Sequence, residues 1–517
     1  MSAPPNQQLL INARAFQTRV ALVDAKPAAG GRQPQLRELH LVEPAKASNV
    51  GNLLWGRVQR ILPGMQAAFV DVGLARPGFL HASDIERRSF VAHSAEEDKP
   101  LEPAAPKDIR KLVHEGQMLC VQVAKDPIAS KGARLTTQVT LASRFLVLTP
   151  DSQHIGISQR LGCETERARL QALVVQCARE AGLPTQHGFI VRTVADGVGK
   201  AELLADMEYL KVLWQQIEHA SRNAQLGDVL HTELPVEVRV LRDLVNATIV
   251  GIRIDDEAIY NKAYAYLEQH SPDYLDRIAL HEGAKTLFDS YAIEPQIEAA
   301  LGSHVSLPCG GYLVIEQTEA MITVDVNTGG YIGSSNLEET VFRTNMEAAV
   351  ALPAQLRVRN LGGLVAVDFI DMTIDEHKQQ VFDALSAACA ADPTPTRLLG
   401  ISEFGIVELS RKRTRESLYQ QLNEVCASCQ GSGRTKKPST VCFEILRALE
   451  CVSGSGEREC VVHAHQAVVQ RLRTDEAQQL QAVVDRSGLR VSLQDEARFA
   501  ADQFDLVCME KVHDSVE

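Results

Sequence analysis

The chain has 517 residues, of which 45% are hydrophobic and 23% charged, and its formal net charge is −13. These proportions are those of globular domains, so they exclude disordered and fibrous classes for the bulk of the chain, and the length predicts about three to five compact units. The acidic balance argues against a protein that coats nucleic acid non-specifically, but it allows local basic sites.

Membrane and secretion signals are not evident in the sequence. No stretch approaches the roughly 20 consecutive apolar residues of a spanning helix, and the start, MSAPPNQQLLINAR, lacks the layout of a signal peptide. A cytoplasmic protein with no membrane partner is therefore expected. Most of the 11 cysteines lie in apolar or helical runs, where a small buried side chain is the expected role.

Strands are predicted for the first part of the chain. Residues 9–25 and 36–44 alternate apolar and polar side chains around a Gly/Pro-rich turn at 27–31, which predicts a hairpin. From residue 49 to about 140, short strands separated by turns predict a small barrel, interrupted by an acidic surface loop at 93–108.

Helices and strands mix in the rest of the chain. Helices are expected at 165–181 and 200–220, with a strand at 188–195 between them, and further strands at 233–241 and 246–255. Residues 311–422 form the clearest α/β block. Its expected elements are a hairpin over 311–327, a helix from Leu337, a strand over 361–369 and a helix over 375–391, and another helix begins near Thr440.

Polar residues at the ends of two apolar strands are candidate metal ligands. Asp325 and Asn327 share one face of the strand MITVDVN, and Asp368 ends the apolar strand GGLVAVD. Open α/β sheets keep their sites at such strand ends, and Mg²⁺ takes one or two protein carboxylates plus phosphate oxygens. The pattern predicts a Mg²⁺ site that acts on a phosphodiester, with turn or helix capping as the alternative.

The barrel segment carries two aromatic residues on a polar face. Phe69 lies opposite the apolar face of its strand, and Phe79 shares a face with His81. Such rings stack on the bases of single strands in OB-type barrels, and Lys131 and Arg57 would add phosphate contacts. Packing of both rings under a loop is the alternative.

One close cysteine pair stands out. Cys426 and Cys429 lie in the Gly-rich segment CASCQGSGR between predicted helices, which favours a zinc knuckle over a redox pair. The pair supplies two of the four ligands that Zn²⁺ usually takes, so a symmetric dimer sharing one Zn²⁺ is the economical completion. Two unrelated thiols are the alternative.

Basic residues cluster in this acidic chain at 411–415 (RKRTR) and 434–437 (RTKK), although a solvated helix face is the commoner explanation for such runs. Arg192 and Thr193 combine a guanidinium with a hydroxyl beside a Gly-rich turn. This pair is suited to a phosphate or to a turn.

Several long segments in the same order resemble the ribonuclease E/G family, and the resemblance covers nearly the whole chain. The segments are LLINAR, QAAFVDVG, SKGARLTT, FIVRT, VDVNTGGY, LEETVFRTNMEAA, LRVRNLGGLVAVDFIDM, RKRTRESL and CASCQGSGR. Because the chain carries no long C-terminal extension, it is expected to resemble the shorter type of member, which lacks a scaffold tail for other enzymes.

The resemblance implies an α+β multidomain fold. An S1-type OB barrel is inserted in an RNase H-like domain and is followed by a 5′-end sensor, a DNase I-like α/β catalytic domain, a zinc link and a small C-terminal domain. The implied ranges are 1–47 and 236–300 for the RNase H-like domain, 48–140 for the barrel, 141–235 for the sensor, 301–422 for the catalytic domain, 423–438 for the zinc link and 439–517 for the C-terminal domain.

The resemblance also assigns roles to individual positions. By role, these are Asp325, Asn327 and Asp368 for catalysis, with the two aspartates as Mg²⁺ ligands; Phe69, Phe79 and Lys131 for RNA binding; Arg192, Thr193 and Val147 for the pocket that senses a 5′-monophosphate; and Cys426 and Cys429 for a structural Zn²⁺ shared between subunits.

Two segments depart from the family pattern. Pro393 and Pro395 occupy a stretch where the family often has a basic residue that completes the 5′ pocket, and Arg397 is the candidate substitute. Pro353 is expected to kink or restart a helix that the family normally continues.

The expected activity is Mg²⁺-dependent cleavage of single-stranded RNA, which leaves 5′-phosphate and 3′-hydroxyl ends. The enzyme is expected to favour 5′-monophosphorylated RNA, to act in rRNA 5′-end maturation and mRNA decay, and to form a homodimer through zinc or a higher oligomer. The competing classes are a non-catalytic RNA-binding protein and a DNA-directed nuclease on the same scaffold.

Overall fold

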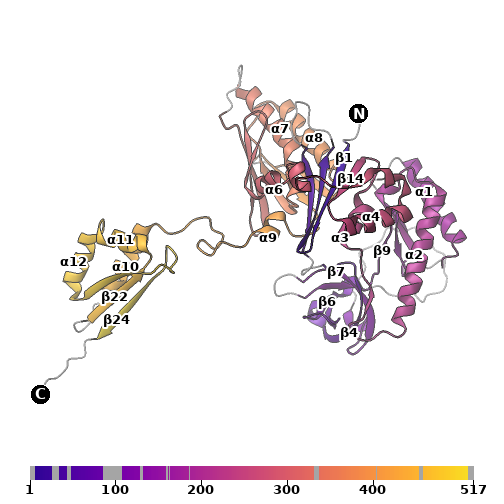
Figure 1. Cartoon of the computed structure of the whole chain (residues 1–517). Helices are drawn as coiled ribbons and strands as arrows, with labels where there is room; N and C mark the ends of the chain where they lie inside the picture. Colours follow the sequence, from indigo (N-terminus) through magenta and orange to yellow (C-terminus); the bar gives the residue numbers. More distant parts are fainter. Residues whose placement is uncertain are drawn as a thin grey trace. The chain divides into compact units, whose positions relative to one another are not determined.

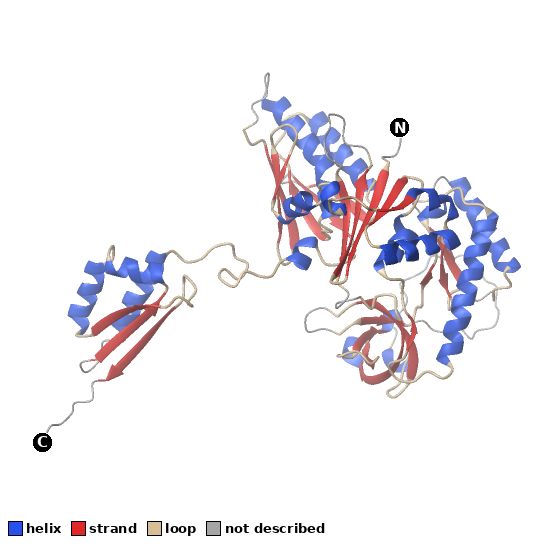
Figure 2. Ribbon diagram, in the orientation of Figure 1, coloured by secondary structure: helices blue, strands red, loops and turns tan. Residues whose placement is uncertain are grey.

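The computed structural model describes residues 6–25, 34–43, 48–85, 108–127, 132–158, 161, 164–184, 187–330, 337–402, 405–452 and 458–510. The chain forms two compact units, Met1–Leu418 and Tyr419–Glu517, and each is described by itself. Figure 1 follows the chain along these units, and Figure 2 shows that helices and strands mix throughout them. Among the described residues, no helix is long and apolar enough to cross a membrane.

The first sheet of the large unit is built from two segments that lie far apart in the sequence. Its strand order is β15-β14-β1-β2-β3, with β14 parallel to β1 and β2 antiparallel to both β1 and β3. The intervening chain is therefore an insertion into this sheet. The strands are β1 (Gln7–Arg14), β2 (Gln17–Asp24), β3 (Leu36–Val42), β14 (Ile249–Ile254) and β15 (Ile278–Leu280).

The expected N-terminal hairpin is wrong in one respect, because the chain forms three strands there. A tight turn at residues 15–16 divides the apolar run into β1 and β2, and Phe16 at that turn is 76% exposed. No Gly or Pro marks this turn, so the alternation of side chains on either side of it concealed the break.

Helices pack on both faces of the first sheet. On one face, α3 and α4 share a buried core with β1, β2 and β14, and on the other face α5 and α6 pack against β1, β2 and β3. The bounds are α3 (Val236–Leu244), α4 (Glu257–His270), α5 (Leu287–Ser290) and α6 (Glu294–Leu301).

Helix α3 corrects the strand that was expected at 233–241. The alternating valines of PVEVRV favour a strand, but Pro235 stands at the N-cap position with φ −60°, where its fixed backbone suits the start of a helix. Val236, Val240 and Leu241 then pack on the sheet. Burial of this apolar stripe outweighs the local strand propensity.

The expected barrel is present and closed. Its strands follow the order β4-β5-β6-β8-β7, pairing between β4 and β7 closes the ring, and β13 adds to β4. Apolar side chains from β4 to β8 fill its interior. The strands are β4 (Leu53–Leu62), β5 (Ala67–Asp71), β6 (Gly78–His81), β7 (Met118–Lys125), β8 (Arg134–Thr136) and β13 (Val229–His231).

The next part of the large unit is a small sheet with two long helices. The strand order is β11-β12-β10-β9, and α1 and α2, the two helices expected here, pack on this sheet through one apolar core. The elements are β9 (Leu141–Ala142), β10 (Leu146–Thr149), β11 (Ile155–Ile157), α1 (Glu164–Glu180), β12 (Gly188–Val191) and α2 (Lys200–Ser221).

A mixed six-stranded sheet forms the last part of the large unit, in the order β16-β17-β18-β19-β21-β20. Its core is shared with α7 and α8, which pack against each other and against the sheet. The elements are β16 (His304–Ser306), β17 (Tyr312–Gln317), β18 (Met321–Asn327), α7 (Leu337–Val358), β19 (Gly363–Asp368), α8 (Asp375–Ala390), β20 (Thr396–Ile401) and β21 (Ile406–Arg411).

The sequence predicts that Pro353 kinks or restarts its helix, but α7 does not restart there. The helix runs without interruption from Leu337 to Val358, although proline removes one backbone donor. Pro353 is buried, and its neighbours Leu352 and Leu356 belong to the core of the six-stranded sheet. Packing on both sides of the proline keeps the helix continuous.

The small unit is a three-stranded sheet, β23-β22-β24, covered by three helices. Short helix α9 (Leu418–Leu422) lies at the junction of the two units. The other elements are α10 (Pro438–Val452), β22 (Arg458–Ala464), α11 (Gln466–Arg473), α12 (Ala477–Ser487), β23 (Arg490–Asp495) and β24 (Phe504–Glu510).

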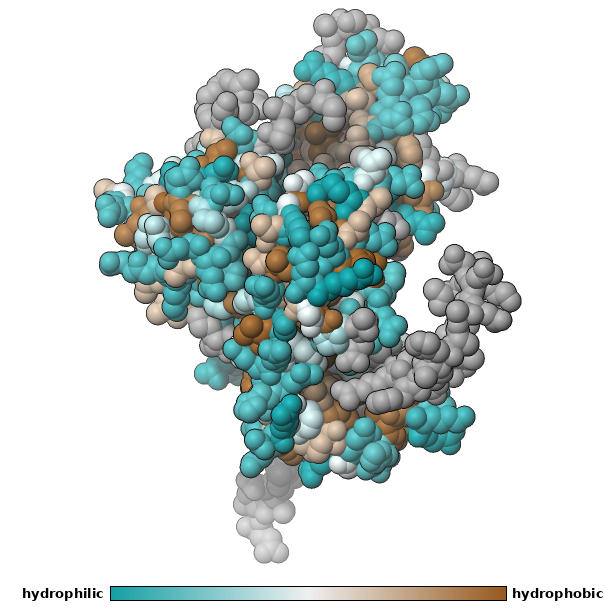
Figure 3. All heavy atoms as spheres, turned by 90° about the vertical axis from the view of Figure 1, so that its right-hand side faces the viewer, coloured by the Kyte–Doolittle hydropathy of each residue, from teal (hydrophilic) through white to brown (hydrophobic). Residues whose placement is uncertain are grey.

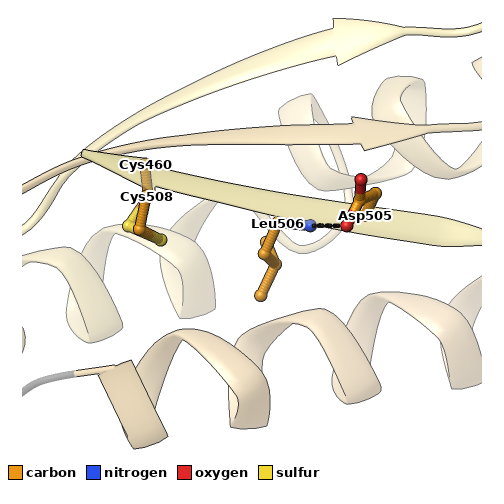
Figure 4. Close-up of a disulfide and its surroundings, with 4 residues drawn as sticks. All are labelled: Cys460, Asp505, Leu506 and Cys508. Atoms are coloured by element: carbon orange, nitrogen blue, oxygen red, sulfur yellow. Dashed lines mark hydrogen bonds between the residues drawn. A yellow bond between two sulfur atoms is a disulfide. The ribbon is translucent and has the colours of Figure 1, made fainter.

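Cys460 and Cys508 are direct partners on β22 and β24 and form a disulfide. Figure 4 shows the bond beside Leu506, which points toward the covering helix, while Asp505 points to the opposite side. The sequence had indicated isolated buried cysteines. The sequence separation of 48 between the two cysteines concealed a pairing that the antiparallel register creates.

These observations confirm the mixed α+β class and the barrel. The names RNase H-like and DNase I-like, and the domain boundaries, stay predictions.

On the face drawn in Figure 3, hydrophobic side chains of the described residues form small separate areas between hydrophilic ones.

Candidate active site

The two candidate metal ligands are neighbours in the six-stranded sheet. Strands β18 and β19 run parallel, and their register pairs Asp325 with Asp368. Because paired residues of neighbouring strands project to the same face, the two carboxylates stand side by side. Both are exposed, whereas Val324 and Val367, which precede them, are buried. The apolar strands therefore hold two solvent-facing carboxylates side by side, near the C-terminal ends of β18 and β19.

Asn327 completes this group. Its Nδ2 donates a hydrogen bond to Oδ2 of Asp325 (2.9 Å), which orients that carboxylate. Among the described residues, Oδ1 of Asp325 and both oxygens of Asp368 have no hydrogen-bond or ion-pair partner. Adjacent anionic oxygens without a protein cation between them are the donors that a hard divalent cation prefers, so the site fits Mg²⁺.

The loop after Asp368 is held by two residues of α7 that the sequence analysis did not single out. Fully buried Asn345 donates from Nδ2 to the Ile370 carbonyl (2.8 Å) and accepts from the Ile370 N–H (3.2 Å). Glu338 accepts from the backbone and hydroxyl of Thr373 (3.1 and 2.7 Å). These hydrogen bonds from Thr373, with others from this loop, lower the pKa of Glu338 to about 2. The loop is thereby fixed to the start of α7.

The aromatic residues of the barrel lie together on its polar face. Phe69 and Phe79 are direct cross-strand partners with ring centroids 6.2 Å apart, and His81 follows at 6.4 Å from Phe79. Both phenylalanines are half-buried, while Ala68 and Val70 point into the barrel core. Arg57 is exposed opposite Asp71 on the neighbouring strand. Lys131 lies outside the described residues.

The three candidate sensor residues belong to the small sheet and the loop that follows it. Val147 on β10 pairs with Ile190 on β12, and Arg192 and Thr193 come directly after β12. Thr193 is exposed at the start of the short 3₁₀ helix Thr193–Ala195. The Arg192 guanidinium contacts two backbone carbonyls and forms an ion pair with Asp243 (2.7 Å).

The first basic island is not a solvated helix face. Arg411 ends β21 and forms a buried ion pair with Asp392 (2.7 Å), in which the side chains are 2% and 4% exposed. Arg415 donates to the Leu39 carbonyl, which leaves Lys412 and Arg413 as the exposed cations. In the second island, Lys436 pairs with Glu444 (2.9 Å).

The proline stretch next to Asp392 is exposed at Pro393 and Pro395. Arg397 is exposed on β20.

The cysteine pair of the small unit lies in a tight turn, and neither cysteine forms a disulfide. The Gln430 N–H donates to the Cys426 carbonyl (2.7 Å), and Gln430 and Gly431 both adopt positive φ. Hydrogen bonds from the backbone of Cys429 and Ser428 lower the pKa of the exposed Cys426 thiol. A turn that stabilises a thiolate fits a zinc knuckle. Among the described residues, no group of three or more possible ligands surrounds the pair.

Comparison with known proteins identifies the class to which this fold and site belong. Residues 140–414 match the model of the ribonuclease E/G family. Since this match covers half of the chain, and full-length relatives exceed 40% identity, the chain belongs to the ribonuclease E/G family. The expected enzyme class, an endoribonuclease, is confirmed.

Individual relatives refine this assignment. Ribonuclease G of Escherichia coli K12 is 42% identical over 97% of this chain and 99% of its own length. Ribonuclease G of Haemophilus influenzae is 41% identical over the same shares. Ribonuclease E of Escherichia coli K12 is 35% identical over 86% of this chain but only 40% of its own length. The expected closer resemblance to the shorter type of member is confirmed.

Proposed function

We propose that this protein is a Mg²⁺-dependent endoribonuclease that cleaves single-stranded RNA and leaves 5′-phosphate and 3′-hydroxyl ends. The observation that carries the proposal is the register of β18 and β19, which sets Asp325 beside Asp368 with Asn327 bonded to the first. A non-catalytic RNA-binding protein would have no use for two adjacent exposed carboxylates, which repel the RNA backbone.

In the proposed mechanism, Asp325 and Asp368 would hold the cation, and the hydrogen bond from Asn327 fixes the orientation of the Asp325 carboxylate. When bound, Mg²⁺ would activate water and neutralise the charge that develops on the scissile phosphate. Water attacks phosphorus in line with the bond to the 3′ oxygen, which leaves as a hydroxyl. Asn345 and Glu338 contribute by fixing the loop that follows Asp368.

The barrel supplies the proposed single-strand specificity. Two adjacent half-exposed rings, Phe69 and Phe79, form a stacking surface that unpaired bases reach and paired bases do not. Lys131 is proposed to add a phosphate contact. The protein is proposed to act in the cytoplasm on rRNA precursors, in 5′-end maturation, and on mRNA, in decay.

A 5′-monophosphate preference is part of the proposal. Arg192 and Thr193 offer a guanidinium and an exposed hydroxyl side by side, with Val147 in the same sheet. Because Pro393 and Pro395 occupy the stretch where this family often has a basic residue, the preference is expected to rest mainly on Arg192.

One assay separates the candidate functions. RNA and DNA oligonucleotides of the same sequence, single-stranded and duplex, are incubated with Mg²⁺ or with EDTA. Cleavage of single-stranded RNA in Mg²⁺ alone supports the proposal. Cleavage of DNA at a comparable rate would indicate a DNA-directed nuclease, and cleavage that persists in EDTA would exclude the Mg²⁺ mechanism.

A further inference from the structure

The guanidinium of Arg192 is anchored on two sides. Its Nη1 donates to the carbonyls of Ser143 (2.8 Å) and Arg144 (3.3 Å), and its Nη2 donates to Oδ1 of Asp243 (2.7 Å). Three of the five N–H groups are therefore used. Among the described residues, Nε has no partner, and one N–H of Nη2 is unused.

The unused groups define where a ligand can bind. Two N–H groups of one guanidinium can hold a phosphate through two hydrogen bonds, so the unused Nε–H and Nη2–H are the groups that remain for a ligand. The side chain is 21% exposed, so part of it reaches solvent. Asp243 and the two carbonyls thus leave two N–H groups of Arg192 for a ligand.

The turn that accepts from Arg192 is itself fixed. Buried Asp206 on α2 accepts from the Ser143 hydroxyl (2.5 Å) and from the N–H groups of Phe145 and Leu146 (2.9 and 3.0 Å). The Arg192 N–H donates in turn to the Phe145 carbonyl (2.9 Å). The carbonyls that hold Arg192 therefore have little freedom to move.

Asp243 is held by a second arginine. Nε of Arg242 donates to Asp243 (3.0 Å), while its Nη1 reaches Glu233 (2.8 Å) and the carbonyl of Ala142 (3.1 Å), the residue paired with Val147. Burial opposes ionisation of Asp243, but the hydrogen bond and charge of Arg242, together with Arg192, outweigh it and lower the pKa. Asp243 is thus an ionised carboxylate beside the proposed 5′-phosphate pocket.

We propose that Asp243 is a positioning residue that determines specificity in this pocket: it orients Arg192 toward the RNA 5′ end, and its negative charge favours a 5′-monophosphate over a 5′-triphosphate. The inference rests on the proposed 5′-end preference. Repulsion by a fixed carboxylate grows with the charge of the ligand, and a triphosphate carries more negative charge than a monophosphate. A carboxylate next to the recognition arginine therefore penalises the triphosphate more.

The test compares oligoribonucleotides that differ only in the 5′ end, namely monophosphate, triphosphate and hydroxyl. The Asp243→Asn variant keeps an oxygen that accepts from Arg192 but removes the charge. We expect its ratio of kcat/KM for monophosphate over triphosphate to fall about five-fold, the order for one charge acting through partly screened solvent, mainly through a lower KM for the triphosphate. The hydroxyl substrate should be unaffected.

Three comparisons make the result decisive. Glu218→Gln removes an exposed charge from α2 of the same sheet-and-helix part, without contact to Arg192, and should leave the ratio unchanged. Arg192→Gln should abolish the preference altogether. In the unmodified protein, the preference for monophosphate over triphosphate should shrink as salt rises, which tests the charge effect even if Asp243→Asn folds poorly.

The outcomes distinguish a failure of the role proposed for Asp243 from a failure of the proposed 5′-phosphate pocket. Arg192→Gln could abolish the preference for the monophosphate while Asp243→Asn and salt leave it unchanged. This result would overturn the role of Asp243, but the proposed 5′-phosphate pocket would stand. Equal losses on all three substrates in Asp243→Asn would show a merely structural role. If the unmodified protein does not distinguish the three 5′ ends, both the pocket and the inference are overturned.

Discussion

Two paired aspartates set the chemistry at the scale of single residues. Asp325→Asn or Asp368→Asn removes one anionic oxygen donor without changing side-chain size, so we expect RNA cleavage to be abolished while RNA binding is largely retained. Cleavage is measured over a Mg²⁺ titration, and binding is measured in EDTA. Asp383→Asn, an exposed aspartate on α8, is the matched control. Full Mg²⁺-dependent activity in both site variants would refute the metal assignment.

The buried ion pair between Arg411 and Asp392 allows a prediction about the free energy of unfolding. Asp392→Ala leaves the guanidinium of Arg411 buried without its partner, which is expected to cost about 3–5 kcal/mol of unfolding free energy. Thermal or chemical unfolding of the purified variant measures this loss. Asp375→Ala, which breaks the exposed pair with Lys378, is the control and should change stability little. Similar stability of the two variants would show that Arg411 finds another partner.

At this scale, the sequence predicted residues whose position follows from strand alternation. Period two places Asp325 and Asn327 on one face of their strand, whereas the place of Asp368 beside Asp325 depends on the register of β18 and β19. Asn345 and Glu338 were missed because their role depends on a contact between α7 and a loop 25 to 36 residues further along the chain. No local pattern marks such a contact. Asp243 was missed for the same reason, since 51 residues separate it from Arg192.

Two neighbouring strands of the barrel, β5 and β6, allow a prediction about the affinity for single-stranded RNA. The rings of Phe69 and Phe79 project from β5 and β6 as cross-strand partners, so Phe69→Ala and Phe79→Ala should each weaken single-strand RNA binding by about 1–3 kcal/mol. Fluorescence anisotropy with a short oligoribonucleotide in EDTA measures the loss. Phe16→Ala, which removes an exposed ring from the turn between β1 and β2, should leave the affinity unchanged. Unchanged affinity in both barrel variants, with the fold intact, would show that the rings do not contact RNA.

Elements were predictable where pattern and packing agree. The long helices α1, α2, α7 and α8 have helical periodicity and also bury the corresponding face, so they were found within a few residues. Helix α3 was read as a strand because its valines alternate, and only its packing on the first sheet decides between the two structures. Competition between local propensity and tertiary burial explains this error.

At the scale of the whole molecule, the cysteine knuckle is expected to set quaternary structure through one Zn²⁺ shared by two chains. Two thiolates from each subunit complete a closed tetrahedral site with no open position for water, so the metal would hold subunits together and take no part in catalysis. The Cys426→Ser, Cys429→Ser double variant, or a strong chelator, should then dissociate the dimer and lower activity. Light scattering with zinc analysis checks this, and Cys451→Ser, which alters another exposed cysteine of the same unit, is the control. One Zn²⁺ per two chains supports the shared site. A dimer that persists after zinc removal would show instead that the knuckle does not link the subunits.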